Sequence, residues 1–377
     1  MTPRQKRWAA IVVGIAAAGV AGLALAALLV AWSGIYSVAA SSGHWAIVDR
    51  FLEFGMRNSV RTHAMPIEVP PLDSPDLVRL GAGHFHSGCA YCHGAPGMPV
   101  NPVASRMLPP PPPLSDAAES WRTRELFWIV KHGIKYTGMP AWVAQQRDDE
   151  VWAVVAFLRR LPHLTPEQYR ELALDRVEIP PKSGPELATA ESDPEAAGAC
   201  ARCHGAGAIG PASRLVPVLH GQKAEYLTAA LQAYATGNRS SGIMQPLASD
   251  LDAESIAKLA RYYAGLAAPR PRAQADADLA SLERGRLLAT VGAPPGRVPA
   301  CNACHGEAGF TTFPRLDGQH APYLQRQLEL WRRGLNAGTD NGAIMAPIAA
   351  RLTDAQIRDV SAYYASLAGK AAEKKPP

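Results

Sequence analysis

Aromatic side chains are scarce in this sequence, at 7% of its 377 residues. A large apolar core must therefore come from leucine, valine and alanine, or from a bound group. Charge of one sign is scarce too, since the formal net charge is +5 and no basic cluster stands out beyond the N-terminal segment. This balance is typical of a solvated surface, and we expect no nucleic-acid partner. No run of residues has the pattern of a strand, so the sequence predicts an all-α protein.

Cysteine occurs only six times, in three pairs that leave none over. Each pair has two residues between its members and a histidine directly after. The three runs are Cys89, Cys92 and His93; Cys200, Cys203 and His204; and Cys301, Cys304 and His305. Such a run is the attachment motif of c-type haem, in which both thiols bond to the porphyrin and the histidine is the proximal iron ligand. We predict three covalently bound haem c groups, each with one iron.

Two other uses of a Cys-x-x-Cys pair fit less well. A zinc site needs four ligands, usually from two such pairs close together. A redox-active pair normally lies at a helix start in a βαβ setting, and it would not need a following histidine three times. The repeated histidine favours haem.

The N-terminal segment is basic and then apolar. Arg4, Lys6 and Arg7 precede residues 9–32, which contain no charge. These 24 residues would form a helix of roughly 36 Å, enough for a bilayer core of about 30 Å. A secretory signal is the alternative, with Ala39 and Ala40 imitating a cleavage site, but its apolar region should span only about 7–15 residues. We predict an uncleaved, single-pass anchor within residues 1–40.

The basic end should remain in the cytoplasm by the positive-inside bias. The rest of the chain then lies in the periplasm, anchored to the bacterial inner membrane, where c-type haem attachment takes place. Residues 41–71 form a connector, and residues 44–60 mix apolar and charged side chains in an amphipathic pattern. Two interpretations stay open: a helix lying on the membrane surface, or a helix packed against the first haem domain.

Proline-rich breaks divide the remainder of the chain. They predict haem-binding domains at 72–165, 186–268 and 279–369, linkers at 166–185 and 269–278, and a frayed tail at 370–377. Each domain is expected to be a few helices wrapped on a haem, because roughly 85 residues cannot easily supply an apolar core alone.

The second and third segments are repeats. Cys200 and Cys301 lie 101 residues apart, as do Met244 and Met345, while the Gly-Gln pairs at 221–222 and 318–319 lie 97 apart. The repeat predicts two helices per copy. Their apolar stripes are Leu227, Leu231 and Tyr234 with Leu324, Leu328 and Trp331, and Ile256, Leu259, Tyr263 and Leu266 with Ile357, Val360, Tyr364 and Leu367. Thr353 and Gln356 predict a capping box on the last helix. Residues 121–132 and 149–161 take the same places in the first segment.

A second axial ligand decides whether a haem carries electrons or binds small molecules. Methionine sulfur is soft, favours ferrous iron and raises the potential. Met244 and Met345 each lie forty residues after the haem histidine of their segment, and Met139 lies forty-six after His93. Each is followed within two residues by a proline that leads towards the closing helix. We predict Met139, Met244 and Met345 as the distal iron ligands.

The other candidate ligands are less suitable. Met98 lies too near His93 to cross the ring, and Met107 precedes the stiff prolines 109–113, which would wall the haem edge. The remaining histidines are expected at the surface or in packing roles. These are His220 and His320, which lie too near their haem motifs, and His132, which lies inside a predicted helix.

The last two segments resemble the diheme cytochrome c4 family. The resemblance rests on Cys-x-x-Cys-His-Gly in both, on Gly-Gln-x-x-x-Tyr-Leu at 221–227 and 318–324, and on Met-x-Pro followed by a Tyr-Tyr helix. The first segment resembles single-haem class I cytochrome c domains through Gly-Ile-Lys at 133–135 and Thr-Gly-Met-Pro-Ala-Trp at 137–142. The resemblance implies three class I cytochrome c domains, periplasmic electron transfer, commonly to a haem–copper terminal oxidase, and repeat domains that face each other.

The sequence thus predicts a membrane-anchored triheme electron carrier of a respiratory chain, without catalytic residues, whose partners are redox proteins and the membrane. One alternative is the cytochrome subunit of a membrane dehydrogenase that passes electrons to quinone. Another is a haem peroxidase or small-anion reductase, which needs one open haem. A suitable methionine in every segment argues against that enzyme. The donor, the acceptor and the order of the haem potentials are left open.

Overall fold

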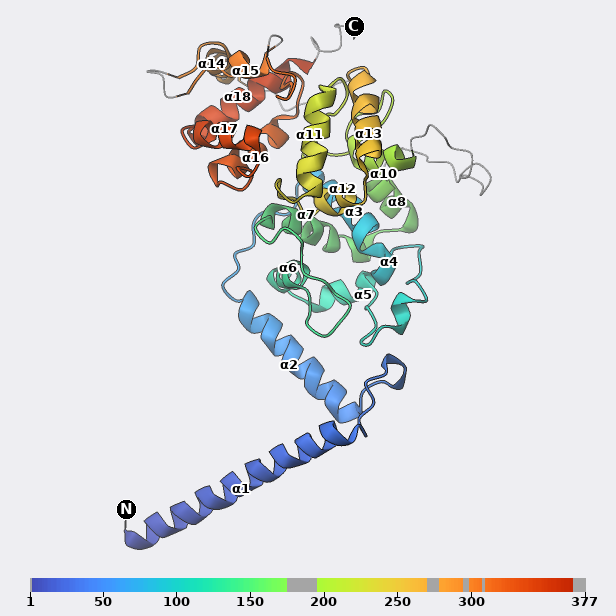
Figure 1. Ribbon diagram of the computed structural model, residues 1–377, viewed down its shortest axis with the longest axis vertical. Coiled ribbons are helices and arrows are strands. Elements are labelled where there is room, and N and C mark those ends of the chain that lie inside the picture. The colour runs from blue at the N-terminus through green and yellow to red at the C-terminus, as the bar shows by residue number, and fades with distance from the viewer. Residues whose placement is uncertain (1, 175–194, 270–277, 294–297, 307–308, 369–377) are drawn as a thin grey trace.

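Helices and loops make up the described chain, which comprises residues 2–174, 195–269, 278–293, 298–306 and 309–368 of this computed structural model. Within these residues strand pairing is limited to two isolated bridges, Ala95 with Met98 and Ala293 with Val298. One long helix projects from a body of shorter helices (Figure 1). The prediction of an all-α protein is confirmed.

The projecting helix is α1 (Pro3–Ser33). It begins with a capping box between Thr2 and Gln5, and it ends at Gly34, whose φ of 67° is the left-handed conformation that glycine adopts without strain. None of its residues is buried. The helix is long and apolar enough to cross a membrane, although a signal sequence meets the same criterion.

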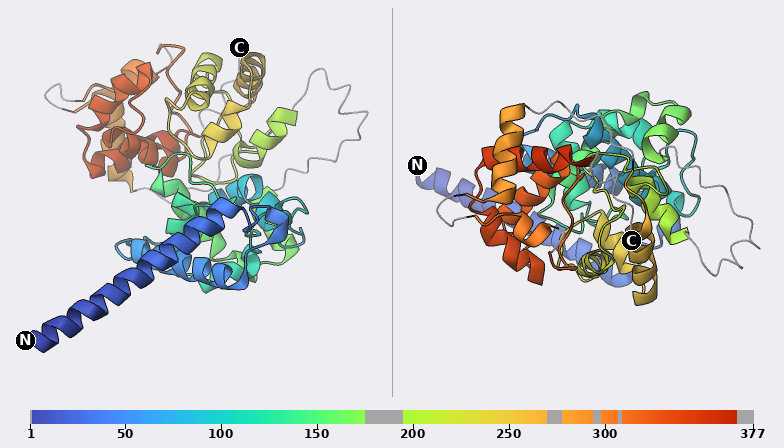
Figure 2. Two further views of the ribbon diagram at one scale, coloured as in Figure 1. Left: turned by 60° about the horizontal axis from the view of Figure 1, so that its bottom comes forward. Right: turned by 90° about the horizontal axis from the view of Figure 1, so that it is seen from above.

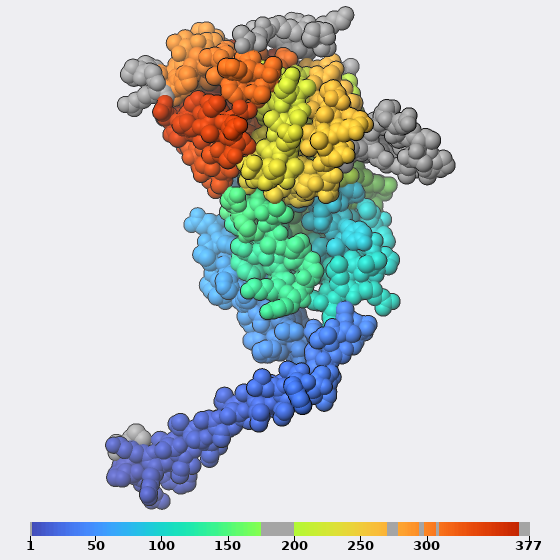
Figure 3. Space-filling model, in the orientation of Figure 1, coloured from blue at the N-terminus to red at the C-terminus, as the bar shows by residue number. Residues whose placement is uncertain are grey.

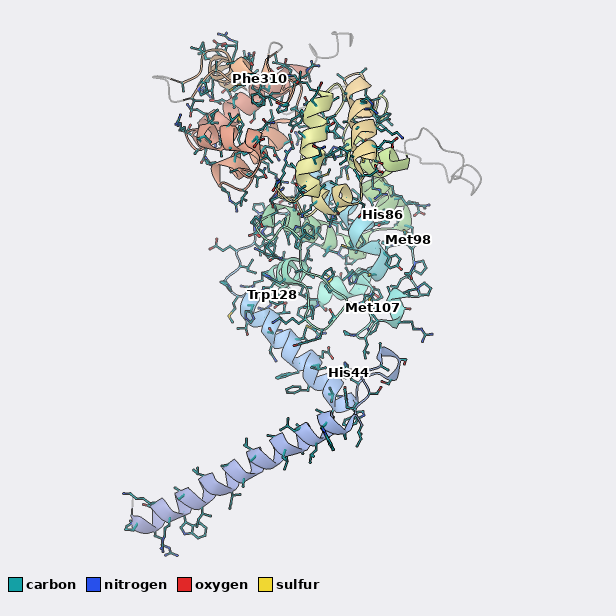
Figure 4. The ribbon with its side chains drawn as sticks, viewed as in Figure 1. His44, His86, Met98, Met107, Trp128 and Phe310 are labelled. Atoms are coloured by element: carbon teal, nitrogen blue, oxygen red, sulfur yellow. The ribbon has the colours of Figure 1, made fainter. Side chains whose placement is uncertain are left out.

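The connector contains a short turn η1 (Ala40–Ser42) and the helix α2 (Ala46–Ala64). Near its end, Val60 and Ala64 are buried and Arg57 lies 5.1 Å above the ring of Trp121 in the first domain. Towards its start, Ile47 and Phe51 are more than 70% exposed. Figure 4 labels Trp128 beside the upper end of α2. The packing interpretation is therefore confirmed for the second half of α2, and the first half leaves an apolar surface uncovered.

The first domain is built on the pair α3 and α7, which cross so closely that position 81 must be glycine. A Cβ at Gly81 would lie 1.9 Å from the carbonyl oxygen of Ala153. Phe85 and Phe157 pack at this crossing with their rings tilted by 47° and the centroids 5.1 Å apart. The helices of the domain are α3 (Pro75–Gly88), α4 (Ala90–His93), η2 (Ala104–Arg106), α5 (Leu114–Ala117), η3 (Ala118–Ser120), α6 (Thr123–His132), α7 (Asp148–Leu158), η4 (Leu161–His163) and α8 (Pro166–Leu174).

The helix α8 lies where the sequence predicts the beginning of a linker. Its Tyr169 is fully buried, and the Tyr169 hydroxyl lies 2.8 Å from Nδ1 of His86 on α3. Pro166 starts this helix, because proline is well suited to the first helical position. Residues 166–174 therefore belong to the first domain, and the rest of the expected linker, 175–185, lies outside the described residues.

The second and third domains both contain the two helices that the repeat predicts, with a shorter helix between them, and the third domain begins with a further helix. Those of the second are α10 (Glu195–His204), α11 (Ala224–Ala235), α12 (Met244–Ser249) and α13 (Ala253–Gly265). Those of the third are α14 (Leu279–Thr290), α15 (Asn302–His305), α16 (Ala321–Arg332), α17 (Asp340–Ala349) and α18 (Asp354–Ser366). The capping box between Thr353 and Gln356 is confirmed.

The three domains are arranged with the first between the connector and the other two (Figures 1 and 3). Figure 2 shows the third domain beside the second, with the first domain against both. The buried apolar cluster of the second domain consists of Leu227, Ala260 and Tyr263 among the described residues. So small a cluster agrees with a core that a bound group completes.

Candidate haem sites

Each predicted proximal histidine is oriented by the carbonyl group of a proline. The Nδ1–oxygen distances are 2.8 Å for His93 and Pro112, 3.2 Å for His204 and Pro217, and 2.9 Å for His305 and Pro314. A carbonyl oxygen only accepts, so Nδ1 carries the proton and donates it. Nε2 is then left with a free lone pair, which is the form that binds a metal. The sequence could not predict these three acceptors, because every residue has a backbone carbonyl group.

Burial keeps these histidines neutral. It lowers the pKa of His204 to about 4, and it lowers the pKa of His93 and of His305 as well. A neutral imidazole is what an iron ligand must be. All six cysteines are free of disulfides.

Three of the thiols lie in surroundings unlike those of a redox-active pair. Burial raises the pKa of Cys200 and of Cys301 to about 11 and that of Cys89 to about 12. A redox-active Cys-x-x-Cys pair instead has a lowered pKa. For the zinc alternative, the described residues contain no group of three or more histidines, cysteines or carboxylates placed to hold a metal ion. Both findings favour haem attachment.

The second and third sites open into one cavity between their domains. It holds about 1480 Å³ of space, including part that is open to solvent. Its lining includes all the predicted iron ligands and one thiol from each of the two copies: Cys200, His204, Met244, Cys301, His305 and Met345. The walls are mainly apolar side chains from α11, α13, α16 and α18. The structure thus brings together the residues that the sequence predicts for two haems.

A buried arginine in this cavity supports the fit. The Arg239 side chain donates to the hydroxyls of Tyr226 and Tyr323 at 3.3 and 3.4 Å and to Oε1 of Gln327 at 2.9 Å. These partners are neutral, and Arg239 is only 8% exposed. A buried charge needs a counter-charge. The carboxylate groups of a haem are of the required sign.

The predicted first site lies in the first domain, on α4 and on the loop between α6 and α7. Met139 is half-buried in a tight turn, where its carbonyl oxygen accepts from the amide of Ile134 at 3.2 Å and its amide donates to Oγ1 of Thr137 at 3.0 Å. The Met107 sulfur packs on the same loop, 2.6 Å from where a Cβ at Gly138 would lie. Met139 as an iron ligand stays a prediction.

The other candidates have non-ligand surroundings. Met98 pairs its backbone with Ala95 and is 43% exposed. His220 and His320 are each 6% exposed, and Nδ1 of His320 lies 3.1 Å from the carbonyl oxygen of Val216 in the second domain. His132 ends α6 and is exposed beside Trp128. Figure 4 labels Met98 and Met107 on the loops of the first domain.

Comparison with known proteins places these sites in a family. Residues 76–158 and 186–262 match the family described as cytochrome c oxidase, cbb3-type, subunit III, and residues 297–368 match cytochrome c. The chain is 37% identical to a thiosulfate dehydrogenase electron acceptor of Stutzerimonas stutzeri, over 46% of this chain and 82% of that protein. It is 39% identical to cytochrome c4 of Thiocapsa roseopersicina, over 46% of this chain and 89% of that protein.

A cytochrome c4 of Pseudomonas aeruginosa is 34% identical, over 45% of this chain and 85% of that protein. The cytochrome c domains imply covalently bound haem c, and the three Cys-x-x-Cys-His runs are consistent with three such groups. Because it covers most of the length of these relatives and shares their haem motifs, the chain belongs to the cytochrome c family, with cytochrome c4 among its relatives, and its function is that of an electron carrier.

Proposed function

We propose that this protein passes electrons along three haem c groups in the periplasm, anchored to the inner membrane by α1. The observation that carries the proposal is the tautomer of the three haem histidines, each fixed by a proline carbonyl so that Nε2 is free to bind iron. In this proposal the distal ligands are Met139, Met244 and Met345. Bound haem supplies an iron that takes up and releases one electron.

The side chains around the iron then set the potential. The methionine sulfur favours the ferrous state, and each proline carbonyl makes its histidine a stronger ligand. The mainly apolar walls of the shared cavity give the second and third sites surroundings of low polarity. With both axial positions filled, small molecules have no access to the metal. The residues therefore support electron transfer and not catalysis.

Carbon monoxide binding distinguishes an electron carrier from a haem enzyme with an open iron site. The reduced wild-type protein should bind little carbon monoxide, and it should not turn over peroxide. Binding of about one carbon monoxide per chain, together with peroxide turnover, would mean that one haem has an open position. That haem would then be an active site, and the carrier proposal would fail.

For the partners, we propose a terminal oxidase as electron acceptor and a periplasmic dehydrogenase as donor. Two similarities support this: the matching family described as an oxidase subunit, and the relative described as an electron acceptor of thiosulfate dehydrogenase. The second candidate is a cytochrome subunit of a membrane dehydrogenase that reduces quinone. The similarity to the electron acceptor of thiosulfate dehydrogenase supports it as well. Co-purification from native membranes distinguishes them. Recovery with an oxidase supports the first, and a stable complex with only a quinone-linked dehydrogenase supports the second.

The anchor is tested separately. The 31 residues of α1 would span roughly 46 Å, and none of them is covered by the rest of the chain. Carbonate washing should therefore leave the protein in the membrane pellet, with a mature N-terminus near Met1. A soluble form that starts near Ser41 would show that the segment is a cleaved signal.

A further inference from the structure

The loop that leads into Met244 is held by a carboxylate of another domain. Glu150, on α7 of the first domain, is 3% exposed. Its Oε1 accepts a hydrogen bond from the Ser241 hydroxyl at 2.6 Å, and its Oε2 accepts one from the Gly242 amide at 2.6 Å. Figure 1 shows α12, which follows this loop, next to α7. Both oxygens of one buried carboxylate are therefore used by the loop.

Ser241 passes this restraint on to the methionine. Its hydroxyl oxygen accepts from the amide of Met244 at 3.0 Å and from that of Ile243 at 3.3 Å. The hydroxyl proton is committed to Glu150, so its lone pairs face these two amides. The first turn of α12, and with it the backbone position of Met244, is thus held from the first domain.

Neighbouring side chains keep Glu150 in place. The Arg147 guanidinium lies 2.9 Å from Oε1 of Glu150 and donates to the carbonyl oxygen of Ser240 at 2.6 Å. Nε2 of Gln146 donates to Oγ of Ser240 at 2.9 Å. Arg147 also pairs with Asp149 at 2.9 Å. The carboxylate therefore has a cationic partner, which it shares with Asp149, and is held against the loop.

The corresponding loop of the third domain is held from within. There, Thr339 caps α17 by accepting the amide of Gly342 at 2.9 Å, three residues before Met345. The two repeats thus carry equivalent methionines, but only the loop of Met244 has this support from the first domain among the described contacts.

We propose that Glu150 is a positioning residue for the distal ligand of the second haem, so that docking of the first domain sets the potential of that haem. This inference rests on Met244 being the ligand. A fixed methionine keeps its sulfur on the iron and holds the potential high. Without Glu150 the loop is free to rearrange, and the second haem loses its distal ligand for part of the time.

The test compares three variants of the full-length, haem-loaded protein. Met244→Ala should open one haem, which removes about one third of the far-red absorption band of methionine-ligated ferric haem. Glu150→Gln keeps the shape of the side chain but replaces one carboxylate oxygen with an amide NH₂ group. That group cannot accept a hydrogen bond from the Ser241 hydroxyl or the Gly242 amide. This substitution should reduce the same band, raise carbon monoxide binding towards one per chain, and lower one of the three potentials. Ser241→Ala should do the same without changing the first domain.

Asp76→Asn is the matched control. Asp76 joins the same two domains, with Oδ2 2.7 Å from Nε of Arg214, but on the side of the histidine motif. It should leave the band and the potentials unchanged. If Met244→Ala has no effect, the ligand assignment fails. If Met244→Ala opens one haem while Glu150→Gln and Ser241→Ala behave as wild type, or if Asp76→Asn matches Glu150→Gln, the role of Glu150 is refuted.

Discussion

The second and third domains are copies of one repeat that share their internal contacts and differ in their external ones. In both copies, the amide of the glycine before the repeated glutamine donates a hydrogen bond to a tyrosine carbonyl of the closing helix. The distances are 3.0 Å for Gly221 and Tyr263 and 2.9 Å for Gly318 and Tyr364. The methionine loops differ, since one is supported by Glu150 and the other by its own Thr339. The two copies thus share the contacts within the repeat. The contacts that hold their methionine loops differ, because the two copies have different neighbours in the structure.

The interface between the copies is also symmetric. The Gln222 amide group accepts from the Arg315 amide at 2.8 Å and donates to the Arg315 carbonyl at 3.1 Å. Gln319 does the same with the backbone of Val218 in the other copy. Each glutamine therefore substitutes for a backbone partner across the interface. This exchange explains how both sets of ligands come to line one cavity.

Removing a haem should have the largest effect, and it should differ between the copies. Replacing Cys200 and Cys203 with serine, or Cys301 and Cys304, should lower the pyridine haemochrome count from three per chain to two. Loss of the second haem should also lower the melting temperature by roughly 10 °C or more, and further than loss of the third, because the second domain makes the Glu150 and Asp76 contacts with the first domain as well as the glutamine contacts with the third. A count that stays at three would show that the site is misassigned, and equal melting temperatures would contradict this larger role of the second domain.

Double variants test whether Glu150 acts on the second haem alone. Glu150→Gln with Met345→Ala should bind up to about two carbon monoxide molecules per chain, because two separate haems open. Glu150→Gln with Met244→Ala should bind about one, because both changes act on the same haem. Gas titration of the reduced proteins makes the comparison. Equal binding in both double variants would contradict the difference between the two methionine loops.

A smaller effect is expected from the buried cation of the cavity. Arg239→Gln should lower the potentials of the two cavity haems by tens of millivolts, because a nearby positive charge disfavours ferric iron. The repeat places Asn336 at the corresponding position, 97 residues later, and Asn336→Ala should leave the potentials nearly unchanged. Spectroelectrochemical titration at fixed pH measures both. Unchanged potentials in Arg239→Gln would mean that the arginine does not act on the irons.

The smallest effect concerns an ion pair of the third domain. Arg284 lies 2.7 Å from Oδ2 of Asp359, and its hydrogen bond lowers the pKa of that carboxyl. Asp359→Asn should cost about 1 kcal/mol of unfolding free energy at neutral pH, since Arg284 is partly exposed and solvent screens the pair.

A carboxyl group whose pKa is lowered in the folded state stabilises the protein at pH values above its unfolded-state pKa of about 3.9. This stabilisation is lost as the pH falls through the folded-state pKa. The difference between wild type and Asp359→Asn should therefore shrink in acid, as followed by hydrogen exchange in α14 and α18. The matched position of the second domain is Lys258, which pairs on the surface with Glu254. Lys258→Met should change stability by less than about 0.5 kcal/mol. A difference between wild type and Asp359→Asn that does not depend on pH would contradict the ion pair.

The sequence predicted the parts of the structure that depend on local spacing. The apolar stripes of α11, α13, α16 and α18 are periodic and repeated, so these helices could be predicted directly. The support of Met244 by Glu150 could not, because the two residues lie in different domains and neither belongs to a motif. Pro166 was taken as a break, although proline also starts helices such as α8.

One consequence of the shared cavity concerns how the protein stores charge. With the predicted ligands of two haems lining a single, mainly apolar cavity, an electron on one haem would make the second harder to reduce. The two midpoint potentials measured there are then macroscopic values of the pair, in the way that coupled acids share their titration steps. In this arrangement the second and third domains would hold two coupled electrons beside the single haem of the first, and the first electron to leave the pair would do so at a lower potential than the second.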